Sequence, residues 1–105
     1  MSQNQLTLDA LFEVVKSKIN SQEKGSYSFE LFKKGTEKIT RKIGEEALEV
    51  VIATFIHQQK NEQKTREELV GEVCDLFYHT LVLLASQQIE FSEILAELNK
   101  RNHKK

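Results

Sequence analysis

Four acidic residues form two matched pairs in this sequence: Glu46 and Glu49, then Glu72 and Asp75. Within each pair the residues stand three positions apart, which in an α-helix places both carboxylates on one face. If the two faces turn toward each other, the carboxylates surround one point, and their repulsion is relieved by a positive charge between them. Mg²⁺, a hard cation that prefers oxygen ligands, is the natural candidate. The pattern therefore predicts a carboxylate-bound Mg²⁺ site.

The second acidic pair stands in an unusual context. Glu72 and Asp75 lie in an apolar stretch that includes Val73, Leu76 and Phe77. An ionised group near a protein core needs a partner, because its desolvation is costly. The partner is either a metal ion or a lysine or arginine in a buried salt bridge.

Glycines stand beside both acidic pairs. Gly44 precedes Glu45 and Gly71 precedes Glu72, although a glycine inside a helix costs about 1 kcal/mol relative to alanine. We expect a ligand, a backbone or a neighbouring helix to approach closely at these positions. Close helix packing without a ligand is the alternative.

A basic segment stands just before the first acidic pair and contains Lys33, Lys34, Lys38, Arg41 and Lys42. Lys38, Lys42 and Glu46 follow each other at intervals of four, so they form one stripe on a helix. The alternative is an ordinary salt bridge between Lys42 and Glu46, although lysine before glutamate is the less favourable order. A polyphosphate held through Mg²⁺ would use both the cationic and the anionic parts of the stripe.

Two other residues have less specific signals. Cys74 stands on an apolar helix, so we expect it to fill the core rather than to act as a nucleophile. His79 stands one turn after Asp75. We expect it to contact a ligand, to orient the residues that do, or to be a hydrogen-bonded core histidine. No glycine-rich phosphate loop, zinc-ligand cluster or Ser-His-Asp set occurs in the sequence.

Composition indicates a single all-α domain. The chain has 105 residues, no proline and four glycines, so helices should continue over long stretches. The net charge of −1 argues against nucleic-acid binding through a global basic field. A single cysteine fits a reducing cytosol. We find no signal peptide and no apolar run that we expect to span a membrane, so we expect a cytoplasmic protein.

The helices that position the acids follow from caps and apolar periodicity. We expect four or five helices, arranged as a bundle. The first covers 8–20 and is capped by Thr7, and a short second stretch is capped by Ser28 and ends at Gly35. Two long helices over 36–59 and 65–87 follow, the latter opened by a Thr65–Glu68 capping box, and a last short helix is capped by Ser92. Residues 1–5 and 102–105 are expected to be mobile.

The helix over 65–87 is apolar on more than one side. One stripe contains Leu69, Val73 and Leu76, and another contains Val70 and Phe77. Such a helix is central in a bundle or buried between subunits. We therefore expect a homo-oligomer.

These residues together resemble the phosphoribosyl-ATP pyrophosphohydrolase family. The resemblance covers roughly residues 6–101 and rests on S-Y-S-F-E-L-F-K-K-G-T-E-K-I-T-R-K-I-G-E-E-A-L-E (26–49) and E-L-V-G-E-V-C-D-L-F-Y-H-T-L-V-L-L-A (68–85). A broader likeness links the chain to the all-α nucleoside-triphosphate pyrophosphatases of the MazG type, which share only the E-E-x-x-E and E-x-x-D elements.

The resemblance implies Mg²⁺-dependent hydrolysis of the α–β phosphoanhydride of phosphoribosyl-ATP, the second step of histidine biosynthesis. It implies that the metal is held by Glu46, Glu49, Glu72 and Asp75, and that Glu45 is a general base, an outer ligand or a partner for a lysine. It further implies that the phosphates and the rest of the substrate contact Lys34, Lys38, Arg41, Lys42 and His79.

The resemblance also implies partners and leaves rivals open. A dimer is the expected assembly, and the cyclohydrolase that acts next must be a separate protein. The rivals are a house-cleaning pyrophosphohydrolase of (d)NTPs, a nucleotide-binding regulator without turnover, and a non-catalytic helical module whose acids and lysines merely pair.

Overall fold

The computed structural model describes residues 5–104, which form five α-helices and no strand. The helices are α1 (Leu8–Asn20), α2 (Tyr27–Lys34), α3 (Thr36–Lys60), α4 (Gln63–Ser86) and α5 (Phe91–Lys104). The all-α prediction is therefore confirmed. Residues 1–4 and 105, part of the segments expected to be mobile, lie outside the described residues.

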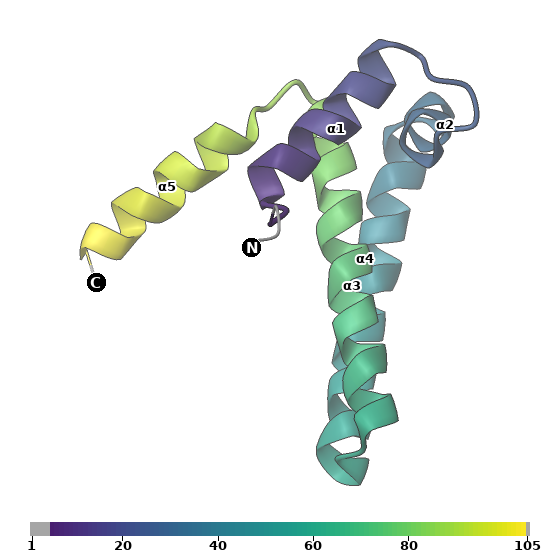
Figure 1. Ribbon diagram of the computed structural model, residues 1–105, viewed down its shortest axis with the longest axis vertical. Helices are drawn as coiled ribbons and strands as arrows, with labels where there is room; N and C mark the ends of the chain where they lie inside the picture. The colour runs from purple at the N-terminus through teal and green to yellow at the C-terminus, as the bar shows by residue number, and fades with distance from the viewer. Residues whose placement is uncertain (1–4, 105) are drawn as a thin grey trace.

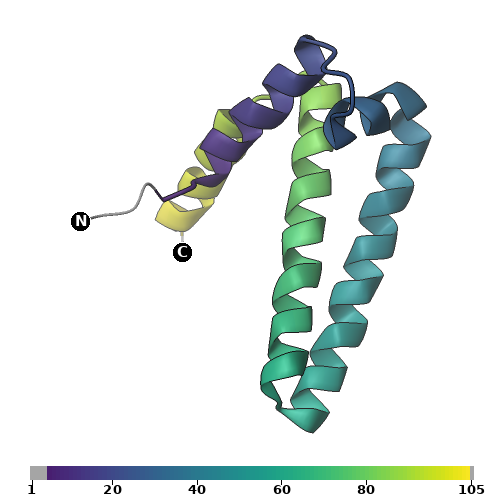
Figure 2. The ribbon, with the colours of Figure 1, turned by 45° about the vertical axis from the view of Figure 1, so that its right-hand side comes forward.

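The architecture is a long antiparallel hairpin of α3 and α4 with the other helices gathered at one end (Figure 1). Helices α1 and α2 pack where α3 begins and α4 ends, whereas the turn between α3 and α4 extends far from them (Figure 2). α5 leaves the end of α4 and contacts α1. Only one end of the hairpin is covered by other helices.

The core lies at this covered end. One cluster joins Val15 and Ile19 of α1 to Leu31 of α2, Ile39 of α3 and Val82 of α4. A second cluster, formed by Phe12, Leu81, Leu84 and Phe91, connects α1, α4 and the start of α5. These contacts hold the two long helices in register.

Of the first two predicted N-caps, one is confirmed and the other is wrong. Thr7 caps α1 by accepting a hydrogen bond from the Ala10 amide at 3.2 Å, as predicted. The expected cap at Ser28 is wrong: Ser26 caps α2 and accepts from the Phe29 amide at 3.2 Å. Ser28 is fully buried inside the helix, where its hydroxyl hydrogen-bonds with that of Tyr78.

The later helix starts also differ from the prediction. α4 begins at Gln63, because Glu62 rather than Thr65 is the N-cap. Thr65 Oγ1 accepts a hydrogen bond from the Glu62 amide at 3.1 Å and also lies 2.8 Å from His57 Nδ1. The last helix begins at Phe91, one residue before Ser92, and continues to Lys104. Residues 102–104, expected in a mobile tail, therefore belong to α5.

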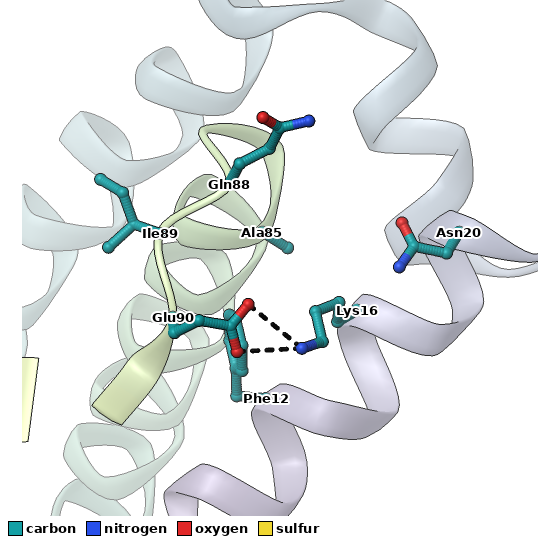
Figure 3. A pocket seen from close by; sticks show the side chains of 7 residues that line it. All are labelled: Phe12, Lys16, Asn20, Ala85, Gln88, Ile89 and Glu90. Atoms are coloured by element: carbon teal, nitrogen blue, oxygen red, sulfur yellow. Dashed lines mark hydrogen bonds and ion pairs between the residues drawn. The ribbon is translucent and has the colours of Figure 1, made fainter. Parts of the chain in front are cut away.

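A surface ion pair attaches the start of α5 to α1. Lys16 Nζ lies 2.9 Å from Glu90 Oε1, beside a pocket whose wall also contains Phe12 and Asn20 (Figure 3). Exposed pairs of this kind add little to stability, because water screens their charges. The pair orients α5 more than it stabilises the fold.

The open part of the hairpin exposes large apolar side chains, namely Leu48, Val51, Ile52, Phe55, Ile56, Val70 and Phe77. Cys74 is exposed as well, so its expected place in the core is wrong. By length and composition α4 is apolar enough to cross a membrane, whereas we expected no such segment. Within one chain the burial expected for the whole of α4 is limited mainly to its C-terminal third.

We predict that Ile39→Ala lowers the free energy of unfolding by about 2–5 kcal/mol, because it leaves a cavity where α1, α2 and α4 meet on α3. Urea denaturation at fixed protein concentration measures the change. Val14→Ala on the exposed side of α1 is the control and should change stability by less than about 0.5 kcal/mol. Equal losses in the two variants would contradict this location of the core.

Candidate metal and phosphate site

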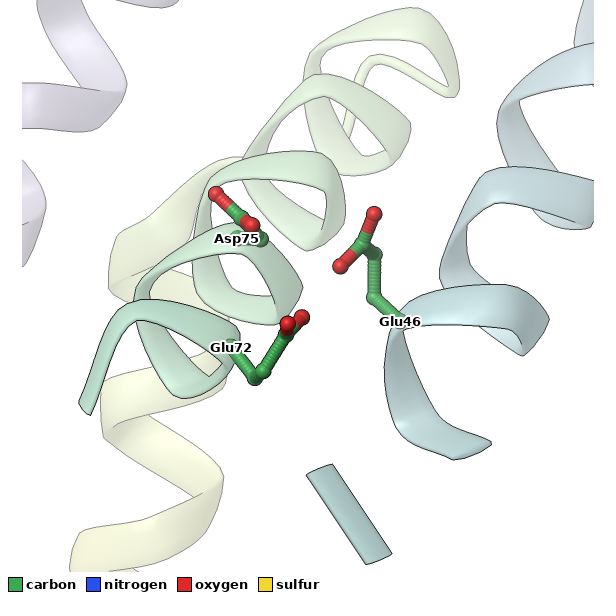
Figure 4. A group of neighbouring side chains, drawn as sticks. All are labelled: Glu46, Glu72 and Asp75. Carbon is green, nitrogen blue, oxygen red and sulfur yellow. The ribbon is translucent and has the colours of Figure 1, made fainter. Parts of the chain in front are cut away.

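Three of the four predicted metal ligands come together across the hairpin. Glu46 extends from α3 toward Glu72 and Asp75 of α4 (Figure 4). One carboxylate oxygen of each residue lies within 4.8 Å of the corresponding oxygens of the other two. The helical spacing of Glu72 and Asp75 places both on the side of α4 that faces Glu46.

The fourth acid, Glu49, stands beside this group rather than inside it. Its side chain is exposed, and its carboxyl is a neighbour of both Glu46 and Glu72. Glu49 and Glu72 also line a pocket with Ile52 and Ile56. The site therefore consists of three converging carboxylates with a fourth at its rim.

Glu46 and Glu72 are partly removed from water without hydrogen bonds to replace it at every oxygen, whereas Asp75 is exposed. Glu46 is only 6% exposed. Oε1 of Glu46 and Oε1 of Glu72 are buried and have no hydrogen-bond partner in the part of the chain that the structure describes. Buried anionic oxygens of this kind are unfavourable unless a positive group binds them.

This environment changes the acidity of two of the acids. Burial raises the pKa of the Glu46 carboxyl, and the charges of Glu49 and Asp75 raise it further, while Lys42 opposes them. The pKa of Glu72 is raised to about 7, mainly by its contact with the Glu49 carboxyl and also by burial and the nearby negative charges. Protons therefore compete with a metal ion for this group near neutral pH.

Only one cation among the described residues contacts the acids. Lys42 Nζ lies 3.8 Å from Glu46 Oε2 and 3.8 Å from Glu45 Oε1. The alternative of a salt bridge thus holds for Glu46, but within residues 5–104 no lysine or arginine pairs with Glu72 or Asp75. A single lysine leaves the group with excess negative charge, which fits a divalent cation with oxygen ligands.

The other predicted phosphate contacts lie along the approach to the acids. Lys34 is exposed at the end of α2, Lys38 is half-buried in the first turn of α3, and Arg41 pairs with Glu37 at 3.4 Å. The structure brings none of the three into an ion pair with the four acids, as far as the described residues show. Their role as phosphate ligands stays a prediction.

The two glycines do not mark a close approach within one chain. A Cβ atom added at Gly44 or Gly71 would meet no other atom within 4 Å. The expected contact with a helix or backbone of the same chain is therefore wrong. Glycine beside the acids leaves open space on the surface of both helices.

His79 and a residue that the sequence did not single out, Tyr27, form a polar link behind the acids. His79 is 6% exposed; its Nδ1 lies 2.7 Å from the backbone carbonyl of Asp75 and its Nε2 lies 2.7 Å from the Tyr27 hydroxyl. Because both ring nitrogens have partners, the predicted contact of His79 with substrate would replace one of these bonds. No local signal points to Tyr27, because 52 positions separate it from His79.

Comparisons with known proteins agree with this geometry. The family profile described as phosphoribosyl-ATP pyrophosphohydrolase matches residues 8–102. A phosphoribosyl-ATP pyrophosphatase of Clostridium acetobutylicum is 43% identical over 104 residues, which cover 99% of this chain and 87% of the relative. One from Listeria monocytogenes is 50% identical over 97 residues, covering 92% and 86%. One from Geobacter metallireducens is 43% identical over 101 residues, covering 96% and 86%.

These matches span the acidic pairs, the basic segment and the helices that carry them. The resemblance inferred from the residues alone is confirmed. The chain belongs to the phosphoribosyl-ATP pyrophosphohydrolase family.

Proposed function

We propose that this chain hydrolyses the α–β phosphoanhydride of phosphoribosyl-ATP to phosphoribosyl-AMP and pyrophosphate, with Mg²⁺, in the second step of histidine biosynthesis. Membership of the family supports the substrate. The observation that supports the chemistry is the convergence of Glu46, Glu72 and Asp75, two of which hold a buried oxygen without a partner.

Each acid has a role that follows from its position. Glu46, Glu72 and Asp75 would hold the metal, and Glu49 would join them from the rim through a change of rotamer. Bound Mg²⁺ supplies a Lewis acid that makes a water more acidic and balances charge on phosphate oxygens. Glu45, exposed and paired with Lys42, orients this lysine, serves as an outer ligand or acts as the base.

The lysines suit the phosphate chain. Lys42 adjoins Glu46 and can turn from its carboxylates to a phosphate when a metal neutralises them. Lys38, Arg41 and Lys34 continue the cationic surface toward the beginning of α3 and the end of α2. The negative charge of a polyphosphate that extends from the acids along this path would be balanced by positive groups over its whole length.

The rival functions make different demands on the acids and on the base pocket. A (d)NTP pyrophosphohydrolase would need the same carboxylates, and a different base pocket would distinguish it. A purely structural module predicts acids that are paired with lysines, whereas Glu72 and Asp75 have no such partner among residues 5–104. The family match favours phosphoribosyl-ATP over both rivals.

The exposed apolar face of the hairpin supports a homodimer as the working unit. Leu48, Val51, Phe55 and Val70 are each at least half exposed on the two long helices. A contiguous apolar surface of this kind marks an interaction site. A second copy would cover it. We propose cytoplasmic localisation, with a cyclohydrolase acting on the product.

We predict that Glu46→Gln and Asp75→Asn lower the rate of Mg²⁺-dependent pyrophosphate release from phosphoribosyl-ATP roughly 100-fold or more while the fold is kept, because each removes a charged metal ligand. The assay is run with excess Mg²⁺ and with EDTA, beside ATP and a panel of dNTPs. Glu67→Gln, an exposed glutamate of α4 that does not line the pocket beside Glu72, is the matched control and should stay active.

The same assay separates the rival functions. Release from dNTPs in preference to phosphoribosyl-ATP would move the chain to the house-cleaning enzymes. If both acidic variants turned over like the wild type, the metal-site assignment would be wrong. Binding of Mg²⁺-nucleotide without any release would indicate a regulator.

The raised pKa of Glu72 predicts a specific dependence of stability on pH. The folded chain holds this proton more tightly than the unfolded chain, with a pKa of about 7 against 4.5. The contribution to stability is therefore present below pH 4.5 and lost as pH rises through about 7. Without metal, the Tm should fall between pH 5.5 and pH 8, and added Mg²⁺ should raise it more at pH 8.

Thermal unfolding of wild type and Glu72→Gln across this pH range tests the assignment. The variant should show a flatter profile and a weaker response to Mg²⁺, because it has no proton to lose at this position. Glu67→Gln should keep the wild-type slope. Identical profiles for wild type and Glu72→Gln would show that this carboxyl does not titrate as described.

We predict that the wild type sediments as a dimer and that Phe55→Lys shifts it toward monomer, because a charge in the apolar face must be desolvated on association. Phe55 is 65% exposed in the single chain. Val14→Lys, on the exposed side of α1, is the control and should remain dimeric. A monomeric wild type, or equal dissociation of both variants, would argue against this face as the interface.

A further inference from the structure

The acidic site accounts for phosphate chemistry but not for recognition of the nucleoside. The chain contains only two tyrosines, Tyr27 and Tyr78, and both lie near the acids. Their ring centroids are 6.2 Å apart, yet their surroundings differ. This difference shows which ring is free to meet a ligand.

Tyr78 is used by the fold. Its ring packs against the cluster formed by Val15, Ile39 and Val82, and its hydroxyl hydrogen-bonds with buried Ser28. A ring enclosed in this way stabilises the junction of α2 with α4. Tyr78 is less exposed than Tyr27, and its hydroxyl is already used by Ser28.

Tyr27 is exposed but held in place. Its side chain is 50% exposed at the first position of α2, where the cap by Ser26 determines the direction of the chain. Its hydroxyl nevertheless lies 2.7 Å from His79 Nε2, and the two rings meet edge to face with centroids 5.6 Å apart. An anchored ring loses little further conformational entropy when a ligand binds.

The anchor itself is rigid. The Asp75 carbonyl can only accept a hydrogen bond, so His79 Nδ1 donates to it and Nε2 of the neutral ring accepts from Tyr27. Burial of the hydroxyl raises the pKa of Tyr27, so it keeps the proton that it donates. His79 is thus a positioning residue for Tyr27.

Tyr27 also lies within reach of the acidic site. The charged groups that act on its hydroxyl are Lys42, Glu46 and Asp75. These belong to the proposed metal and phosphate site, from which the sugar and base of a nucleotide must project. A half-exposed aromatic face beside bound phosphates is a natural surface on which a base stacks.

We propose that Tyr27, held by His79, is the aromatic contact for the planar base of the nucleotide substrate. The inference rests on the proposed function for the identity of the nucleotide. Aromatic stacking would give affinity for the base, while the carboxylates and lysines act on the phosphates. Loss of the ring should therefore weaken binding of the nucleoside part and leave binding of a base-free phosphate unchanged.

The test uses binding rather than turnover, so that it can fail separately from the proposed function. Calorimetry measures the Kd of the product phosphoribosyl-AMP, and that of Mg²⁺-pyrophosphate as the base-free ligand, for the full chain. Tyr27→Ala should raise the Kd of phosphoribosyl-AMP about 10-fold or more and change that of pyrophosphate less than about twofold. Tyr27→Phe, which keeps the ring and loses the anchor, should lie between wild type and Tyr27→Ala.

Tyr78→Phe is the matched control, because it removes a hydroxyl from the same junction of α2 and α4. It should lower the Tm without changing either Kd. Tyr27→Leu provides a second non-aromatic variant if Tyr27→Ala does not fold. An unchanged Kd for phosphoribosyl-AMP in the non-aromatic variants, or an equal loss for both ligands, would overturn the proposal even if wild type releases pyrophosphate.

Discussion

Repulsion between carboxylates across the α3–α4 hairpin is the constraint on which this structure depends. Glu46 approaches Glu72 and Asp75 closely, and Glu49 adds a fourth negative charge. With Lys42 as the one cation in contact among the described residues, the hairpin holds an arrangement that is unfavourable by itself. The packed end, where α1 and α2 clamp both helices, must supply the free energy that keeps the acids together. Stability at one end thus maintains a charged site farther along the hairpin.

The site lies at a boundary between two kinds of surface. Toward α1 and α2 the hairpin is covered, and the residues behind the acids, such as Tyr78 and His79, are packed or hydrogen-bonded. In the other direction the same helices expose Val51 and Phe55. A pocket lined by Glu49, Ile52 and Glu72 opens at this transition. Chemistry and association therefore share α3 and α4, the proposed base contact comes from α2, and a change in one is expected to affect the others.

Errors in the sequence-based analysis share a physical cause. Cys74 was expected in the core because composition reports that a side chain is apolar, not which surface covers it. Gly44 and Gly71 were expected at close contacts that do not occur within the chain. The N-cap lies two residues earlier than predicted at α2 and three residues earlier at α4, because more than one polar side chain can cap: Ser26 and Glu62 compete with Ser28 and Thr65. In each case, either the contact that decides the outcome joins residues distant in the sequence, or two neighbouring polar side chains can both cap the helix.

By itself the sequence determined the helical character, the extent of the long helices and the acids at the site, because helix periodicity and i, i+3 spacing are properties of a short stretch of chain. It also determined the family, since long motifs carry that information directly. Only the tertiary structure decided that Glu49 stands at the rim, that Lys42 alone among the predicted basic residues contacts the acids, and that Tyr27 reaches His79. Those arrangements depend on how helices distant in the sequence cross and pack, and no local pattern specifies that geometry.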